Sequence, residues 1–175
     1  MNNFIAVLAY RADKQDGHIL DDAIAITTRP LNPNTPPHSH SELLFPEGMC
    51  FSSATRGQLK PGTRWLEFET VTKHPERWDV YYKNVTLDDL REYKNRATKI
   101  LDRPYNFAGL FLDFFLPLDT IGHIWGDFSN SWYCSQAVWY CLSGKRKRVS
   151  PRRLTTWILK EGFEKIEMDK LKEKL

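Results

Sequence analysis

A cysteine at the start of a predicted helix is the first candidate for chemistry in this chain. The segment 130–142, "NSWYCSQAVWYCL", places Cys134 directly before an apolar, aromatic run that ends at Gly144, a residue typical of helix C-caps. The unpaired N–H groups and the positive dipole end of such a helix favour the thiolate, which is the nucleophilic form. Cys141, two turns further along, and Cys50, in a predicted strand, are expected to pack in the core, and that role is also the alternative for Cys134.

A thiolate nucleophile needs a base, and the chain has five histidines: His18, His38, His40, His74 and His123. His40 is the strongest candidate because Glu42 follows two residues later on the same predicted strand and therefore on the same face. His38 follows two prolines and is expected on the preceding loop, and the other three lie in polar or loop contexts. The alternative for His40 is a half-exposed histidine at a strand start.

The third, orienting residue stays open between three side chains. Pro46 and Gly48 predict a tight turn, and the strand that returns from it brings Ser53 or Thr55 opposite His40, depending on the register. Glu42 is the alternative on the histidine strand itself. Each supplies an oxygen that can fix the tautomer of the imidazole.

The elements that would position these residues fall into two groups. Strands are predicted at 4–11, 38–45, 49–57, 64–71 and 77–85, from their β-branched and aromatic content. Helices are predicted at 86–101, where Thr86 and Asp89 form a capping-box pattern, at 134–142 and at 150–162, where Pro151 follows the N-cap Ser150. A turn leading into a buried helix is expected over 103–116, a last strand over 163–168 and a charged tail over 169–175. Strands before helices, without a β-α-β rhythm, predict a single α+β domain over 1–175, with an antiparallel sheet packed against helices.

Composition excludes several function classes. The net charge of +3 is too small by itself to imply nucleic-acid binding, and three cysteines without regular spacing argue against a disulfide framework or a zinc site. The longest apolar run, 107–118, is too short to span a bilayer, and the N-terminus has no pattern of a signal peptide, so a cytoplasmic location is expected. The basic stretch 145–148, "KRKR", with Arg152 and Arg153 could contact phosphate, but a solvated loop is the favoured interpretation.

Several motifs, taken in order, resemble a known family. The segments are "PHSHSELLFPEG", "CFSSATRG", "RPYNFAGLF", "WYCSQAVWYCL" and "SPRRL". They resemble the circularly permuted NlpC/P60 papain-like cysteine hydrolases, in particular the YiiX-like branch, where a histidine strand of the form S-H-x-E precedes a cysteine helix of the form C-S-E. The resemblance covers about 19–154 and implies a circularly permuted papain-like fold, with a half-barrel sheet packed against helices.

The resemblance also implies roles for residues. Cys134 matches the nucleophile, His40 the base, and Tyr105 the tyrosine that helps the backbone N–H of Cys134 to form an oxyanion site. Relatives carry the orienting residue on the strand after the histidine strand, where Ser53 and Thr55 lie, with Glu42 again as the alternative. Gln136 stands where the branch often has glutamate.

The expected function is therefore a cysteine hydrolase that cleaves an amide bond in a peptide, a peptidoglycan stem peptide or an isopeptide, without a metal or another cofactor. One alternative keeps the Cys–His pair in a thioesterase, lipid acyl hydrolase or acyltransferase. A second is a non-catalytic member that binds a peptide or a partner protein. A cell-wall role would require delivery by lysis, a virion or another system, and the size of the chain would suit a phage or bacterial accessory protein.

Overall fold

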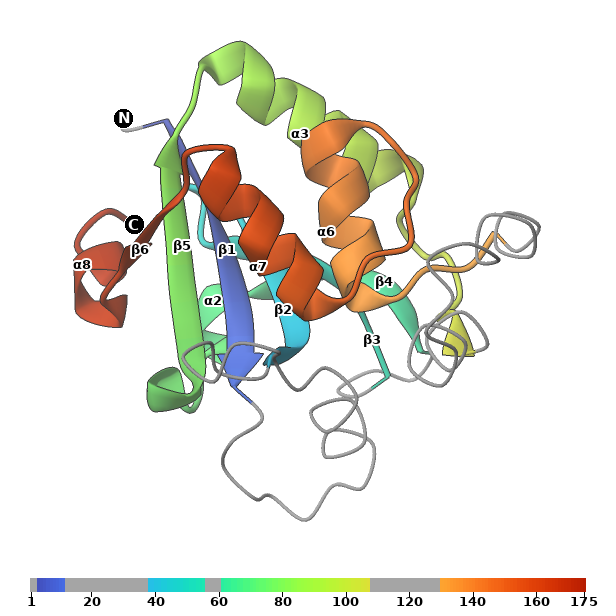
Figure 1. The fold of residues 1–175 in the computed structure, drawn as a ribbon, viewed down its shortest axis with the longest axis horizontal. Helices are drawn as coiled ribbons and strands as arrows, with labels where there is room; N and C mark the ends of the chain where they lie inside the picture. Colours follow the sequence, from blue (N-terminus) through green and yellow to red (C-terminus); the bar gives the residue numbers. More distant parts are fainter. Residues whose placement is uncertain (1–2, 12–37, 56–60, 108–129) are drawn as a thin grey trace.

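The chain folds into one antiparallel sheet with helices on both faces (Figure 1). The computed structural model describes residues 3–11, 38–55, 61–107 and 130–175. The sheet has six strands in the order β4-β3-β2-β1-β5-β6. Their bounds are β1 Phe4–Arg11, β2 His38–Leu44, β3 Met49–Ala54, β4 Gly62–Glu67, β5 Trp78–Asn84 and β6 Glu164–Ile166. The predicted α+β class is confirmed.

The helices complete the described fold. Their bounds are α2 Phe68–Val71, the short 3-10 helix η1 Pro75–Arg77, α3 Leu87–Lys99, α6 Cys134–Ser143, α7 Pro151–Lys160 and α8 Met168–Lys172. Figure 1 shows α6 and α7 lying across one side of the sheet, with α3 beyond them, while α8 lies beside β6.

Strand β1 runs through the centre of the sheet and is apolar on both sides. Ile5 and Val7 join a cluster that buries the inner faces of α3, α6 and α7, which we call the major core. Phe4 and Leu8 point the other way, into a cluster that includes Leu171 of α8, which we call the minor core. Because both faces are covered, β1 reads as a continuous apolar run instead of an alternating one.

Local sequence rules set the ends of the main helices. The predicted capping box at Thr86 and Asp89 is present at the start of α3, and Ser150 caps α7 by accepting from the N–H of Arg153. Gly144 ends α6 with a left-handed backbone at φ 70°, which other residues rarely adopt. These boundaries could be predicted because the capping groups lie within a few residues of the ends that they cap.

Two predicted boundaries were wrong. The strand predicted over 64–71 ends at Glu67, and Phe68 begins the short helix α2, because the chain turns there to bury this ring in the minor core. The charged tail predicted over 169–175 contains α8, whose Leu171 is fully buried against the same cluster. In both places a buried apolar side chain supplies the main contact, and Val71 and Met168 pack against the same cluster beside it. Most of the turn and helix predicted over 103–116 lies outside the described residues.

Candidate active site

The start of α6 is held firmly by the residues on either side of Cys134. The hydroxyl of Tyr133 accepts a hydrogen bond from the N–H of Val149 at 2.8 Å, and Ser135 Oγ donates to the carbonyl of the same residue at 2.5 Å. Tyr133, Cys134 and Ser135 are all almost completely buried. The thiol therefore lies on a segment fixed to the connection between α6 and α7.

The segment before α6 is tied to the far edge of the sheet. The carbonyl of Trp132 accepts from Ser53 Oγ at 2.6 Å and from the N–H of Asn106 at 3.0 Å, and Tyr105 forms a β-bridge with Trp132. Pro104, in turn, bridges to Gly62, where an added Cβ would lie only 2.3 Å from the carbonyl oxygen of Arg103. The close approach of these segments requires glycine at that position.

His40 is the imidazole that meets Cys134. The two side chains interact by charge and by hydrogen bonding. Burial by itself would lower the pKa of His40, but the interactions with Cys134 and Glu42 outweigh it and raise the pKa to about 10. The His40 side chain retains 22% exposure, so one edge of the pair can be reached from solvent. The imidazole of His40, with Glu42 behind it, therefore carries its positive charge beside the sulfur of Cys134.

Glu42 orients His40 and is itself held by Arg64. His40 Nε2 lies 2.8 Å from Glu42 Oε1, and Arg64 donates to both carboxylate oxygens, with Nη1 to Oε2 at 3.0 Å. Burial opposes ionisation of Glu42, but Arg64 and His40 outweigh it and lower the pKa of this carboxyl to about 2. Cys134, His40, Glu42 and Arg64 form a continuous line of alternating charge when the thiol is ionised.

An interruption in the sheet lets this line form. His40 and Glu42 pair with Tyr10 and Leu8, which places them on the minor-core face, whereas α6 packs on the major-core face. Pairing between β2 and β3 covers only two residue pairs, Leu43–Phe51 and Leu44–Cys50, and does not extend to His40. Cys134 can therefore meet a histidine on the opposite face where the ladder between these strands is open.

A bulge separates the two histidines of β2. The register against β1 shifts between Tyr10 and Arg11, and Arg11 then pairs with His38. His38 was expected on a loop, but it begins β2, is fully buried and contacts Asp79 at 2.8 Å. It also lies edge-on to Tyr81 of the major core, so His38 and His40 face opposite sides of the sheet.

The other candidate residues take different places. Ser53 donates its hydroxyl hydrogen to the carbonyl of Trp132. No contact between Thr55 and His40 occurs among the described residues. Of the three orienting candidates, Glu42 is therefore the one that contacts the imidazole. Tyr105 is brought beside the segment before Cys134 by its backbone bridge, and its ring packs on Phe107 with centroids 4.8 Å apart. Of the competing histidines, His74 is exposed and lies near Glu76, and His18 and His123 lie outside the described residues.

The remaining cysteines are buried in apolar surroundings. Cys141 lies in the major core and Cys50 in the minor core, and burial raises the pKa of both thiols well above the ordinary range. The expectation that both pack in the core is confirmed. Arg64 was missed as a site residue because it lies in a predicted strand more than twenty positions from Glu42. The available signal was weak: Arg64 stands beside Trp65 and Leu66 in a predicted strand that also carries the acidic residues Glu67 and Glu69.

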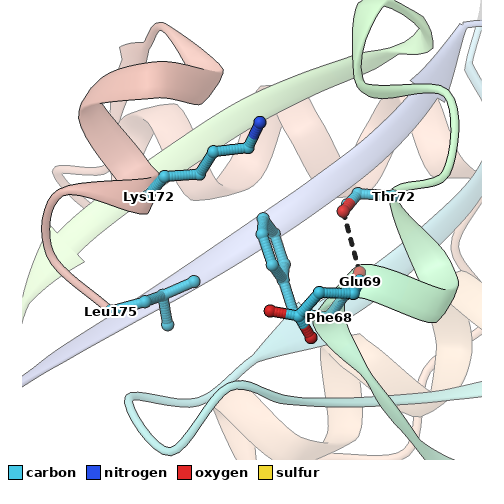
Figure 2. Close-up of a pocket in the computed structure, with 5 residues that line it drawn as sticks. All are labelled: Phe68, Glu69, Thr72, Lys172 and Leu175. Carbon is cyan, nitrogen blue, oxygen red and sulfur yellow. Dashed lines mark hydrogen bonds between the residues drawn. The ribbon is translucent and has the colours of Figure 1, made fainter.

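A surface pocket lies away from these residues. It has a volume of about 440 Å³ between α2 and α8, and it is lined by Phe68, Glu69, Thr72, Lys172 and Leu175 (Figure 2). Figure 2 shows the hydrogen bond from Thr72 Oγ1 to the carbonyl of Phe68 at its edge. Neither Cys134 nor His40 lines it, so it contributes nothing to the Cys–His pair.

The basic stretch 145–148 packs partly on aromatic rings. The guanidinium of Arg146 lies 4.6 Å from the ring centre of Trp132 and donates to the carbonyl of Ser131, and Lys147 lies 5.3 Å from the ring centre of Trp139. These cation–π contacts give the basic side chains a structural role around α6. Within the described ranges, no cluster of three or more His, Cys, Asp or Glu is arranged to hold a metal, and no helix is long and apolar enough to cross a membrane.

Comparison with known proteins supplies no relative. No family model matches the chain, and neither the curated proteins nor the solved structures contain a match.

Proposed function

We propose that this chain is a papain-like cysteine hydrolase that cleaves an amide bond, with Cys134 as nucleophile and His40 as general acid and base. The observation that carries the proposal is the contact of Cys134, at the start of α6, with an imidazole that Glu42 orients. The resemblance to the permuted NlpC/P60 hydrolases supports the same assignment and the permuted papain-like fold.

The chemistry follows from these positions. The Cys134 thiolate attacks the carbonyl carbon of the scissile amide, and the N–H groups of the first turn of α6 face the developing oxyanion, with Tyr105 nearby. Protonated His40 gives its proton to the leaving amine as the C–N bond breaks, which leaves an acyl-enzyme thioester. Neutral His40 then takes a proton from water, and the hydroxide releases the carboxylic acid and restores the thiolate.

The N-terminal end of α6 suits this task. Its N-cap, Tyr133, has an extended backbone, and no side-chain hydrogen bond from that residue caps the helix. Within the described residues, the N-cap side chain thus leaves the N–H groups of the first turn to face a negative charge on sulfur or on an oxyanion. The pair needs no metal for either step.

Selective alkylation tests the nucleophile. Iodoacetamide at pH 7, followed by mass spectrometry of the peptides, should modify Cys134 at least about 100-fold faster than Cys50 or Cys141, since only a thiolate reacts rapidly. His40→Ala should remove this preference, with circular dichroism showing that the variant is folded. Equal labelling of the three thiols in the folded wild-type protein would contradict the proposal.

A substrate panel separates the bond types. Muropeptides, linear peptides and isopeptide-linked peptides test the amide reaction, and acyl thioesters test the alternative in which the same pair hydrolyses or transfers acyl groups. Cys134→Ala is the matched control for each substrate. Turnover of thioesters alone would replace the amide hydrolase with the thioesterase or acyltransferase alternative.

A further inference from the structure

Arg64 reaches the candidate active site from two strands away. It lies on β4, and Glu42 lies on β2, with β3 between them. Strand spacing makes this a span of about 10 Å, which only a long side chain can cover. Ser52, the residue of β3 that pairs with Arg64, is small and fully buried, and its hydroxyl turns onto the carbonyl of Ser41. This small residue leaves room for the guanidinium to cross β3.

The geometry of the contact is specific to arginine. Nη1 and Nη2 donate to the two different oxygens of Glu42, while Oε1 also receives His40 Nε2. A lysine has a single nitrogen and could not hold both oxygens in one plane. The bidentate contact therefore fixes the rotation of the carboxylate and, through it, the direction of the His40 ring.

Charge balance gives Arg64 a second effect. A carboxylate paired only with His40 would neutralise the imidazolium and leave no net positive charge for a thiolate. With Arg64 present, Glu42 is already neutralised, and the charge of His40 is available to Cys134. The neighbouring thiol of Cys50 stays neutral because burial raises its pKa.

Burial of the Arg64–Glu42 ion pair costs free energy that a purely structural contact would not require. Both partners are buried, with side-chain exposures of 8% for Arg64 and 1% for Glu42. Buried ion pairs are often replaced without loss by apolar residues of similar volume. The Nε of Arg64 is also buried without a hydrogen-bond partner among the described residues, which is a further cost that packing does not explain.

We infer that Arg64 is a positioning residue of this site, acting through Glu42 to hold His40 toward Cys134. The inference rests on the proposed function for its catalytic meaning, but the coupling of Arg64, Glu42 and His40 can be measured without a substrate. Lys165 supplies the matched control, because its single nitrogen contacts the buried carboxylate of Asp79, behind His38, at 2.9 Å.

The first measurement is the pH dependence of Cys134 alkylation in Arg64→Met and Lys165→Met. In Arg64→Met, the low-pH range over which the alkylation rate of Cys134 increases should lie about one pH unit higher than in the wild type. Within that range the variant should be labelled about tenfold more slowly, since one unit corresponds to a tenfold change in ionisation. Lys165→Met should leave the profile unchanged. A wild-type profile in folded Arg64→Met would overturn the inference.

A double-mutant cycle tests whether Arg64 acts through Glu42. In a Glu42→Gln background, Arg64→Met should change the labelling rate by less than about twofold, because the carboxylate that it positions is gone. If the effects of Arg64→Met and Glu42→Gln on the labelling rate multiply in the double variant, Arg64 does not act through Glu42. If Arg64→Met does not fold, Arg64→Lys replaces it, and we expect the same direction with a smaller shift because the charge is kept and the second donor is lost.

A readout independent of thiol reactivity separates this inference from the proposed function. The titration of the His40 ring can be followed by NMR in Cys134→Ala. Adding Arg64→Met should raise the midpoint by about one pH unit, since the carboxylate then pairs with the imidazolium alone. An unchanged midpoint would overturn the inference even if Cys134 proves reactive, and unselective labelling of wild-type thiols would overturn the proposed function alone.

Discussion

Strand β2 carries two histidines, each backed by a carboxylate and a cation, and the two lines lie on opposite faces of the sheet. On one face, His38 contacts Asp79, which pairs with Lys165. On the other, His40 contacts Glu42, which pairs with Arg64. The similarity shows that a histidine–carboxylate contact by itself does not define an active site.

The differences lie at the two ends of each line. His38 is fully buried, its Nδ1 has no hydrogen-bond partner among the described residues, and its line ends at a half-exposed lysine. His40 keeps an exposed edge and has Cys134 beside it, and its line ends at a buried arginine. A nucleophile and access to solvent distinguish the second line, and we expect the first to contribute stability only.

The largest expected effect is on thiol reactivity. His40→Ala should slow the alkylation of Cys134 at pH 7 by about 100-fold and reduce amide hydrolysis still more, since the base and the proton donor are both lost. His38→Gln should preserve the rate per folded molecule. Rates are measured by mass spectrometry of the labelled peptides. Equal losses in the two variants would remove the distinction between the lines.

The next effect is on stability in acid. The pKa of Glu42 is lowered to about 2, so its contribution is present above about pH 4.5 and is lost as the pH falls through about 2. This contribution is worth up to about 3 kcal/mol, and Glu42→Gln should therefore flatten the dependence of the unfolding free energy on pH in this window.

Urea unfolding at a series of pH values between about 2 and 6 measures that dependence. Asp79→Asn is the comparison, because the pKa of Asp79 is also lowered, although burial opposes the shift, by His38 and Lys165. We expect a smaller change there, since Lys165 is half-exposed and its charge is screened. A steeper loss in Glu42→Gln than in the wild type would contradict the assignment of an ionised Glu42.

A smaller effect is expected at the alkaline limit. Burial lowers the pKa of His40, but Cys134 and Glu42 raise it to about 10, so the imidazolium, and any stability that it contributes, is lost as the pH rises through this value. Glu42→Gln should bring the alkaline limb of hydrolysis down by about one pH unit, while Asp79→Asn leaves it in place. Initial rates of hydrolysis between about pH 7 and 11 check this. An alkaline limb that stays in place in Glu42→Gln would show that Glu42 does not raise the pKa of His40.

The smallest effect belongs to the structural line. His38→Gln should lower the unfolding free energy by about 1–2 kcal/mol, because a buried partner of Asp79 is replaced by an imperfect one. The labelling profile of Cys134 should stay that of the wild type. Denaturant titration at pH 7 gives the first quantity, and a shifted profile would mean that the two lines communicate through β2.

The sequence by itself determined the local parts of this protein. The helix at Cys134, its end at Gly144, the capping box at Thr86 and the strand of His40 follow from signals within a few residues, and the α+β class follows from their order. The pairing of Cys134 with His40 was predicted with the help of a family resemblance, since no local pattern connects two residues so far apart in the chain.

Only the tertiary structure decided which groups complete the site. The choice of Glu42 over Ser53 and Thr55 depends on the short pairing of β2 with β3, and the recruitment of Arg64 depends on a side chain that crosses β3. The separation of His38 from His40 depends on one bulge. A register shift of one residue reverses every side chain after it, and such shifts are set by packing across the whole sheet, which the sequence of one strand does not record.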